Sequence, residues 1–249
     1  MEVHVNGHPG EELRFRLACE LVQKARAAGQ VVVIVDGSPN PGNIRARLSE
    51  LGALVFPQLH QGIGPSRREA FFHATEVARA KGADIVLWTE PEKVDLIRSV
   101  PQIVAPIEQG EADIVIPRRS AASWETWPSF QRETEEEANR RYNEIVGTDD
   151  HDPMFGPVAF TVNYADYFVL SDRVPEVPDT YIQHYAPIIA ASDAAAVVKS
   201  VEVDMTYPPE QRAEEEGSLS DEMKKKRLWQ RDTLVAAYEK VFQFSRAFA

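Results

Sequence analysis

The sequence predicts an α/β protein with a mostly parallel sheet and helices on both faces of that sheet. Continuous runs of β-branched and apolar residues, such as Val31–Val35, are typical of strands that are buried on both faces. These runs alternate with segments in which apolar residues recur at helical spacing throughout the first half of the chain. Because parallel neighbours need a crossover connection, this alternation favours a parallel sheet whose connections are helices.

The elements expected in the first half are separated by turn residues. Gly52 and Gly82 follow two of the helical segments, and glycine readily adopts the left-handed conformation that closes a helix. The expected strands are Val3–Val5, Val31–Val35, Leu54–Phe56, Asp84–Trp88 and Ala112–Ile116. The expected helices are Leu13–Ala28, Ile44–Leu51, Pro65–Lys81 and Pro101–Gly110.

The second half of the chain has a different pattern. Trp124–Val146 is a highly charged helical region, and Met223–Phe248 is expected to form a long closing helix. Pro208–Ser220 is rich in proline, glutamate and serine, which favours a mobile surface loop. The expected strands of this half are Val158–Thr161 and Val197–Val203.

The composition fits one soluble domain and excludes several classes of protein. With 249 residues and 43% hydrophobic residues, the chain can bury a sizeable core. Its formal net charge of −12 argues against a protein that coats nucleic acid, because phosphate binding needs a basic surface. Its single cysteine, Cys19, excludes a disulfide framework and a cysteine-based metal site.

We expect a single domain over residues 1–249 and a cytoplasmic location. The chain has no apolar run long enough to cross a bilayer, and its first residues are acidic and polar, unlike a signal peptide. Within the domain we expect a ligand-binding half at 1–120, a second half at 121–205, and a loop and C-terminal helix at 206–249. The apolar stripe of that helix could pack on its own sheet or on a second subunit of a homo-oligomer.

Polar side chains follow three of the expected strands, where ligands bind in open parallel sheets. Asp36-Gly37-Ser38 follows the first, Glu90-Pro91-Glu92-Lys93 lies after the second, and Arg118-Arg119 follows the third. Each has a structural alternative. Asp36 also suits a turn, and the two glutamates also suit the N-terminus of a helix. The combination at successive strand ends favours a binding site.

The order of four segments resembles the nucleotide-binding half of glycosyltransferase family 2, which has the GT-A fold. In that family a strand ends in Asp-Gly-Ser, a glycine-rich turn leads to an arginine and a helix, and a later strand ends in an Asp-x-Asp metal motif. The resemblance covers about residues 30–120 and continues more loosely to about residue 205. The segments that carry it are VVVIVDGSPNPGN, HQGIGPSRREAFFHA, KGADIVLWTEPEK and GEADIVIPRRS.

The resemblance implies a binding site for a nucleoside-diphosphate sugar. Asp36 would accept a hydrogen bond from the base, with Ser38 in the same motif, and Arg67 would face the nucleotide. A solvated helix face is the alternative for Arg67.

The chain departs from the family at the metal motif, where Glu90-Pro91-Glu92 replaces Asp-x-Asp. Glutamate can also bind Mg²⁺ or Mn²⁺, and such an ion would stabilise the leaving diphosphate. A weak site, a repositioned site and dependence on Lys93 and the arginines all stay open. His184 is carried over as a third metal ligand, with a hydrogen-bonded core or interface histidine as its alternative.

The segment from Gly147 to Phe160 resembles the acceptor region of polyprenyl-phosphate sugar transferases, where an Asp-Pro and a later glycine precede an apolar strand. Pro157 and Val158 stand where those enzymes usually have an arginine, which makes a lipid-phosphate acceptor a weaker expectation. An inverting transfer needs a base for the acceptor hydroxyl, and we expect Asp152, then Asp150, in that role. A capping role is the alternative for each.

The sequence thus predicts a transferase that moves a sugar from a nucleoside-diphosphate sugar, with UDP or GDP as the nucleotide, to a hydroxyl of a small acceptor with inversion. Two alternatives stay open: a sugar nucleotidyltransferase, and a non-catalytic relative that binds a nucleotide or a protein. The basic run Lys224–Arg227 could bind a phosphate or a membrane surface, but its acidic neighbours favour a solvated face.

Overall fold

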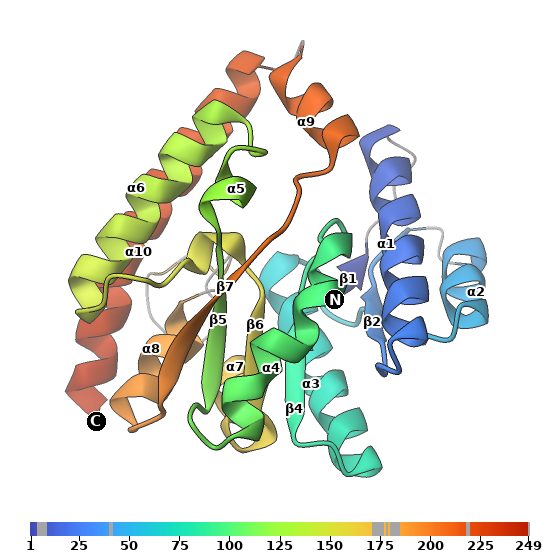
Figure 1. The fold of residues 1–249 in the computed structure, drawn as a ribbon, viewed down its shortest axis with the longest axis horizontal. Helices are drawn as coiled ribbons and strands as arrows, with labels where there is room; N and C mark the ends of the chain where they lie inside the picture. The colour runs from blue at the N-terminus through green and yellow to red at the C-terminus, as the bar shows by residue number, and fades with distance from the viewer. Residues whose placement is uncertain are drawn as a thin grey trace.

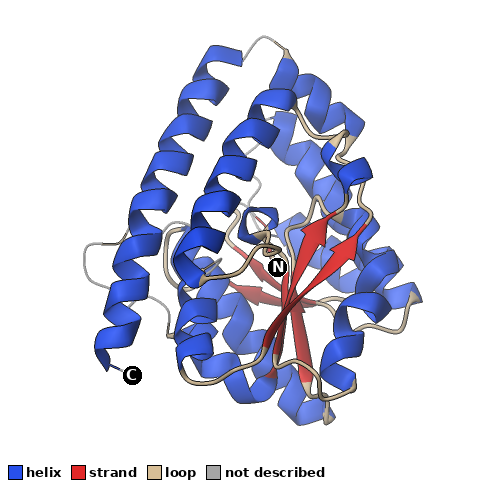
Figure 2. Ribbon diagram, turned by 60° about the vertical axis from the view of Figure 1, so that its left-hand side comes forward, coloured by secondary structure: helices blue, strands red, loops and turns tan. Residues whose placement is uncertain are grey.

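The computed structural model describes residues 1–3, 9–39, 42–170, 177, 179, 185–217 and 220–248. Its strands lie at the centre of the molecule and its helices surround them (Figures 1 and 2). Among the described residues, none of the helices has the length and apolar character needed to span a membrane.

The described strands form two sheets. In the first, β2 lies between β1 and β3, and both pairs are parallel. In the second, the order is β4-β6-β5-β7, with β6 antiparallel to both neighbours and β5 parallel to β7. The strands are β1 (Glu2–Val3), β2 (Val33–Asp36), β3 (Leu54–Pro57), β4 (Ile85–Trp88), β5 (Ile114–Arg119), β6 (Val158–Thr161) and β7 (Val198–Val203).

Helices cover both faces of the second sheet. Successive residues of a strand point to opposite faces, so each face presents its own apolar side chains to the helices that cover it. Ile114 and Ile116 of β5 pack in the same cluster as Phe71 of α3, whereas Val115 packs with Ile103 of α4. All five side chains are buried. The helices are α1 (Pro9–Ala27), α2 (Gly42–Glu50), α3 (Ile63–Lys81), α4 (Val100–Glu108), α5 (Ala121–Trp124), α6 (Ser129–Val146), α7 (Ala165–Val169), α8 (Ala186–Asp193), α9 (Pro209–Glu216) and α10 (Ser220–Phe248), with short 3₁₀ turns η1 (Val94–Ser99), η2 (Pro153–Phe155) and η3 (Val162–Tyr164).

The long helices α6 and α10 lie side by side at one edge of the molecule (Figure 1). Their contact buries Tyr142 of α6 against Tyr238 of α10, with ring centroids 5.4 Å apart. Leu234 and Val241 of α10 join the same cluster. This apolar stripe of α10 is therefore buried within the chain.

The predicted α/β class, with more parallel than antiparallel strand pairs, is confirmed, and three details differ. The predicted mobile loop at Pro208–Ser220 is wrong, because its greater part forms α9. The charged region Trp124–Val146 is two helices, α5 and α6, separated before Ser129 by Pro128. The strand expected at Ala112–Ile116 continues as β5 to Arg119, so Arg118 and Arg119 belong to the strand and do not follow it.

Candidate functional site

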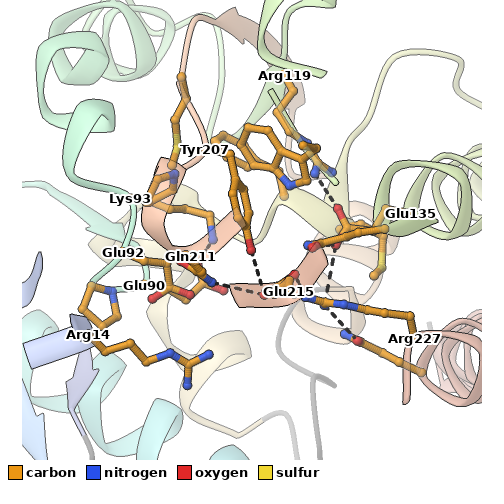
Figure 3. Close-up of a pocket in the computed structure, with 18 of the residues that line it drawn as sticks. Arg14, Glu90, Glu92, Lys93, Arg119, Glu135, Tyr207, Gln211, Glu215 and Arg227 are labelled. Atoms are coloured by element: carbon orange, nitrogen blue, oxygen red, sulfur yellow. Dashed lines mark hydrogen bonds and ion pairs between the residues drawn. The ribbon is translucent and has the colours of Figure 1, made fainter. Parts of the chain in front are cut away.

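A pocket of about 300 Å³ opens at the carboxyl ends of β4 and β5, where α3, α6 and the C-terminal helices meet (Figure 3). Both strands run antiparallel to β6, which lies between them, so their carboxyl ends point to the same edge, where α/β folds bind ligands. The charged and polar residues that line it are Arg14, Arg67, Glu90, Glu92, Lys93, Arg119, Gln131, Glu135, Tyr207, Gln211, Glu215, Lys226, Arg227 and Gln230.

The turn after β4 carries an ion pair that faces this pocket. The Nζ atom of Lys93 lies 2.7 Å from Oε2 of Glu90, and only 11% and 14% of the two side chains are exposed. Arg67 of α3 adds a second cation, with Nη2 at 3.9 Å from Oε1 of Glu90 and its guanidinium 4.8 Å from the centre of the Trp88 ring. Partial burial strengthens these attractions, because water screens them less.

Gly156 allows the carboxylate of Glu90 to lie close to the backbone that precedes β6. The antiparallel register pairs Trp88 with Val158, so Glu90, two residues after β4, meets Gly156, two residues before β6. Gly156 has a φ of +98°, and a Cβ atom at this position would lie 2.6 Å from Oε1 of Glu90. A side chain here would displace Glu90 or the turn, and glycine avoids both costs.

Arg119, at the end of β5, is the centre of a buried ionic cluster. Its Nη2 donates to Oδ1 of Asp152 at 2.6 Å, its Nη1 donates to Glu135, and its guanidinium lies 3.5 Å from the centre of the Trp124 ring. Burial disfavours the charge of Arg119, but Asp152 and Glu135 more than offset this and raise its pKa above the ordinary value.

The carboxylate of Asp152 accepts more hydrogen bonds than we would expect of a general base. Its carboxylate accepts hydrogen bonds from Nε, Nη2 and the backbone N–H of Arg119, from Nδ2 of Asn139 and from the N–H of Phe155, at 2.6–3.2 Å. The pocket beside β4 is not lined by Asp152 or by Asp150. Both line a second pocket of about 450 Å³, together with His151. The contacts favour a positioning role for Asp152, and the base role of either residue stays a prediction.

Asp36 forms a turn, which was the structural alternative to its predicted binding role. Its side chain is fully buried, and it accepts hydrogen bonds from the N–H of Ser38 at 3.0 Å and from Nε of Arg45 at 2.7 Å. Neither Asp36 nor Ser38 lines the pocket beside β4. A base contact by Asp36 stays a prediction, and it would compete with Arg45 for the carboxylate.

The residues expected to bind a divalent metal do not form a ligand set. His184 lies outside the described residues, and within them no group of three His, Cys, Asp or Glu side chains is placed to hold a metal. The carboxylate of Glu90 is paired with Lys93. The described residues therefore do not fit a divalent metal site, and the expected Mg²⁺ or Mn²⁺ stays a prediction that no contact here supports.

The C-terminal third of the chain supplies site residues that the sequence did not reveal. Tyr207 donates its O–H to Glu215 of α9 at 2.9 Å, and Nη2 of Arg227 lies 3.3 Å from the same carboxylate. Burial and the charge of Glu215 raise the pKa of Tyr207 above its ordinary value. The basic run Lys224–Arg227 was the available signal, but only the fold turns Lys226 and Arg227 towards the pocket.

No protein-family model and no curated protein matches the chain. The fold is similar to a crystal structure of a mycobacterial protein, at 14% identity and a TM-score of 0.57, over 83% of this chain and 66% of that one. It is also similar to glucosyl-3-phosphoglycerate synthase of M. tuberculosis, at 14% identity and a TM-score of 0.55, over 92% of this chain and 78% of that one. The chain thus spans a little under two thirds of the mycobacterial protein. At such identities the likeness concerns the fold alone, and it confirms the GT-A-like α/β fold that the motifs predicted.

Proposed function

We propose that the protein transfers a sugar from a nucleoside-diphosphate sugar, with UDP or GDP as the nucleotide, to a hydroxyl group of a small acceptor with inversion. The observation that carries this proposal is the pocket at the end of β4, where Arg67, Glu90, Glu92 and Lys93 meet in a GT-A-like fold. A structural neighbour is named as a synthase of a glucosyl product, which supports the same class of reaction.

The charge of the pocket supports an anionic ligand. Six basic and four acidic side chains line it, although the whole chain has a formal net charge of −12. A local excess of positive charge in an acidic protein attracts a diphosphate to one place and repels it elsewhere.

The proposed reaction is a displacement at the anomeric carbon. The acceptor oxygen attacks that carbon, the bond from the carbon to the phosphate oxygen breaks, and its electron pair leaves with the nucleoside diphosphate. The hydroxyl proton passes to a base. Within the described part of the chain Glu92 makes no hydrogen bond or ion pair, and it is partly exposed in the pocket, so we assign it this role.

A binding screen tests the proposal. Isothermal titration with UDP-, GDP- and ADP-sugars should detect binding of at least one of them. When a suitable acceptor is added to the protein and this donor, the nucleoside diphosphate should be released. Arg67→Met should weaken donor binding by about tenfold, since a charge-assisted contact is lost. Arg79→Met is the matched control, because Arg79 lies half-exposed on the same helix and pairs with Glu76. If no sugar nucleotide binds, the proposal fails.

A further inference from the structure

The carboxylate that would hold a metal is already neutralised by side chains. Lys93 lies 2.7 Å from one oxygen of Glu90, and Arg67 lies 3.9 Å from the other. A Mg²⁺ ion bound to the first oxygen at about 2.1 Å would lie within about 5 Å of the Lys93 ammonium. Two cations at that distance in a half-buried site repel each other, so the ion would have to displace the lysine.

A second set of basic side chains also lines the pocket, contributed by both ends of the chain. Arg14 belongs to α1, and Lys226 and Arg227 belong to α10. Figure 3 shows Arg14 and Arg227 reaching into the pocket from opposite sides. Within the described residues Arg14 and Lys226 make no ion pair, whereas Arg227 faces Glu215 and Glu135 at 3.3 and 3.9 Å.

The like charges of this set affect one another. Burial, and then the charges of Arg227 and Arg14, lower the pKa of Lys226 below its ordinary value, and Glu215 opposes this only in part. Some other basic residues of the same helices have carboxylate partners, as Lys24 of α1 has in Glu20 and Arg231 of α10 has in Asp232. The repulsion between clustered cations is reduced when an anion binds between them.

We propose that these basic side chains form a diphosphate site that works without a divalent metal. Lys93 and Arg67 bind the phosphates beside the end of β4, and Arg14 of α1 and Lys226 and Arg227 of α10 bind them from the two ends of the chain. They donate hydrogen bonds to the oxygens on which negative charge grows as the bond to the sugar breaks. This inference rests on the proposed function and names what takes the place of the metal in it.

The test compares nucleotide binding with and without metal. The nucleoside diphosphate of the donor that binds best is titrated in EDTA, in MgCl₂ and in MnCl₂, and we expect dissociation constants within about twofold of each other. The double variant Arg14→Gln/Lys226→Gln should weaken this binding by about tenfold or more, because two charge-assisted contacts are lost. Binding of the nucleoside alone should not change.

The matched control is Lys24→Gln/Lys225→Gln, which removes one exposed charge from each of the same two helices outside the pocket. It should bind the nucleoside diphosphate like the unaltered protein, and thermal melting checks that both double variants fold. Binding that disappears in EDTA, or equal losses in the two double variants, would overturn the inference while the proposed function stands. Absence of binding in all three solutions would also overturn the inference, and failure of every sugar nucleotide to bind in the donor screen would overturn both.

Discussion

Arg119 and Asp152 form a deeply buried ion pair of the site, with 1% and 7% of their side chains exposed. Several hydrogen bonds hold the pair, which offsets the cost of removing both charges from water. The pair joins β5 to the turn before β6, and Glu135 ties α6 to the same guanidinium. These contacts fix the floor of the pocket.

The contacts of two carboxylates predict opposite effects of neutralising them. Asp152→Asn leaves Arg119 with one charged partner, so the free energy of unfolding should fall by about 3 kcal/mol in urea titrations. Glu92→Gln removes no contact described in the structure, so the free energy of unfolding should not change. Because the proposed base is lost, the rate of transfer should fall by about a hundredfold or more, with donor affinity unchanged.

Asp150→Asn is the control for stability, since Asp150 is partly exposed. If Asp152→Asn stops transfer without loss of stability, Asp152 is the base, and Glu92 is not.

At the residue scale, the sequence predicted the side chains that follow strands and missed those that the tertiary fold brings in. Glu90 and Arg67 were found because strand ends and helix starts are visible in the local pattern. Asp36 illustrates the limit of that rule, because the same position also suits a turn. Arg14 and Lys226 meet only after more than two hundred intervening residues have folded, which no local spacing reveals.

At the scale of elements, α9 is the part of the fold that composition concealed. Its glutamates and prolines resemble a solvated loop, but Tyr207 and Gln211 bury this segment against the pocket. The strands of the first half were predicted because burial on both faces leaves continuous apolar runs. The antiparallel direction of β6 was not, since side-chain periodicity does not encode the direction of pairing.

Glu215 anchors α9 over the pocket, because Tyr207, Gln211 and Arg227 all direct donors to its carboxylate. In Glu215→Ala the amides of 209–216 should exchange with deuterium about tenfold faster, measured by mass spectrometry, while those of β5 stay protected. Glu216→Ala serves as the control, since Glu216 is an exposed residue paired with Arg212. Equal exchange in the two variants would show that Glu215 does not hold the helix.

At the scale of the whole molecule, the fold gathers basic groups that are far apart in an acidic chain. The first helix, the strand ends and the last helix each contribute cations to one pocket. Local sequence does not indicate this convergence, since most of these basic residues have acidic neighbours along the chain. Net charge alone therefore argues against nucleic-acid coating but not against a site for one small polyanion.

The position of a bound donor is the most direct test of this account. A crystal structure with the sugar nucleotide selected by the binding screen should place the diphosphate within hydrogen-bond distance of Lys93 and Arg67, in the pocket beside β4. A diphosphate bound in the other pocket, next to Asp150 and His151, would contradict it.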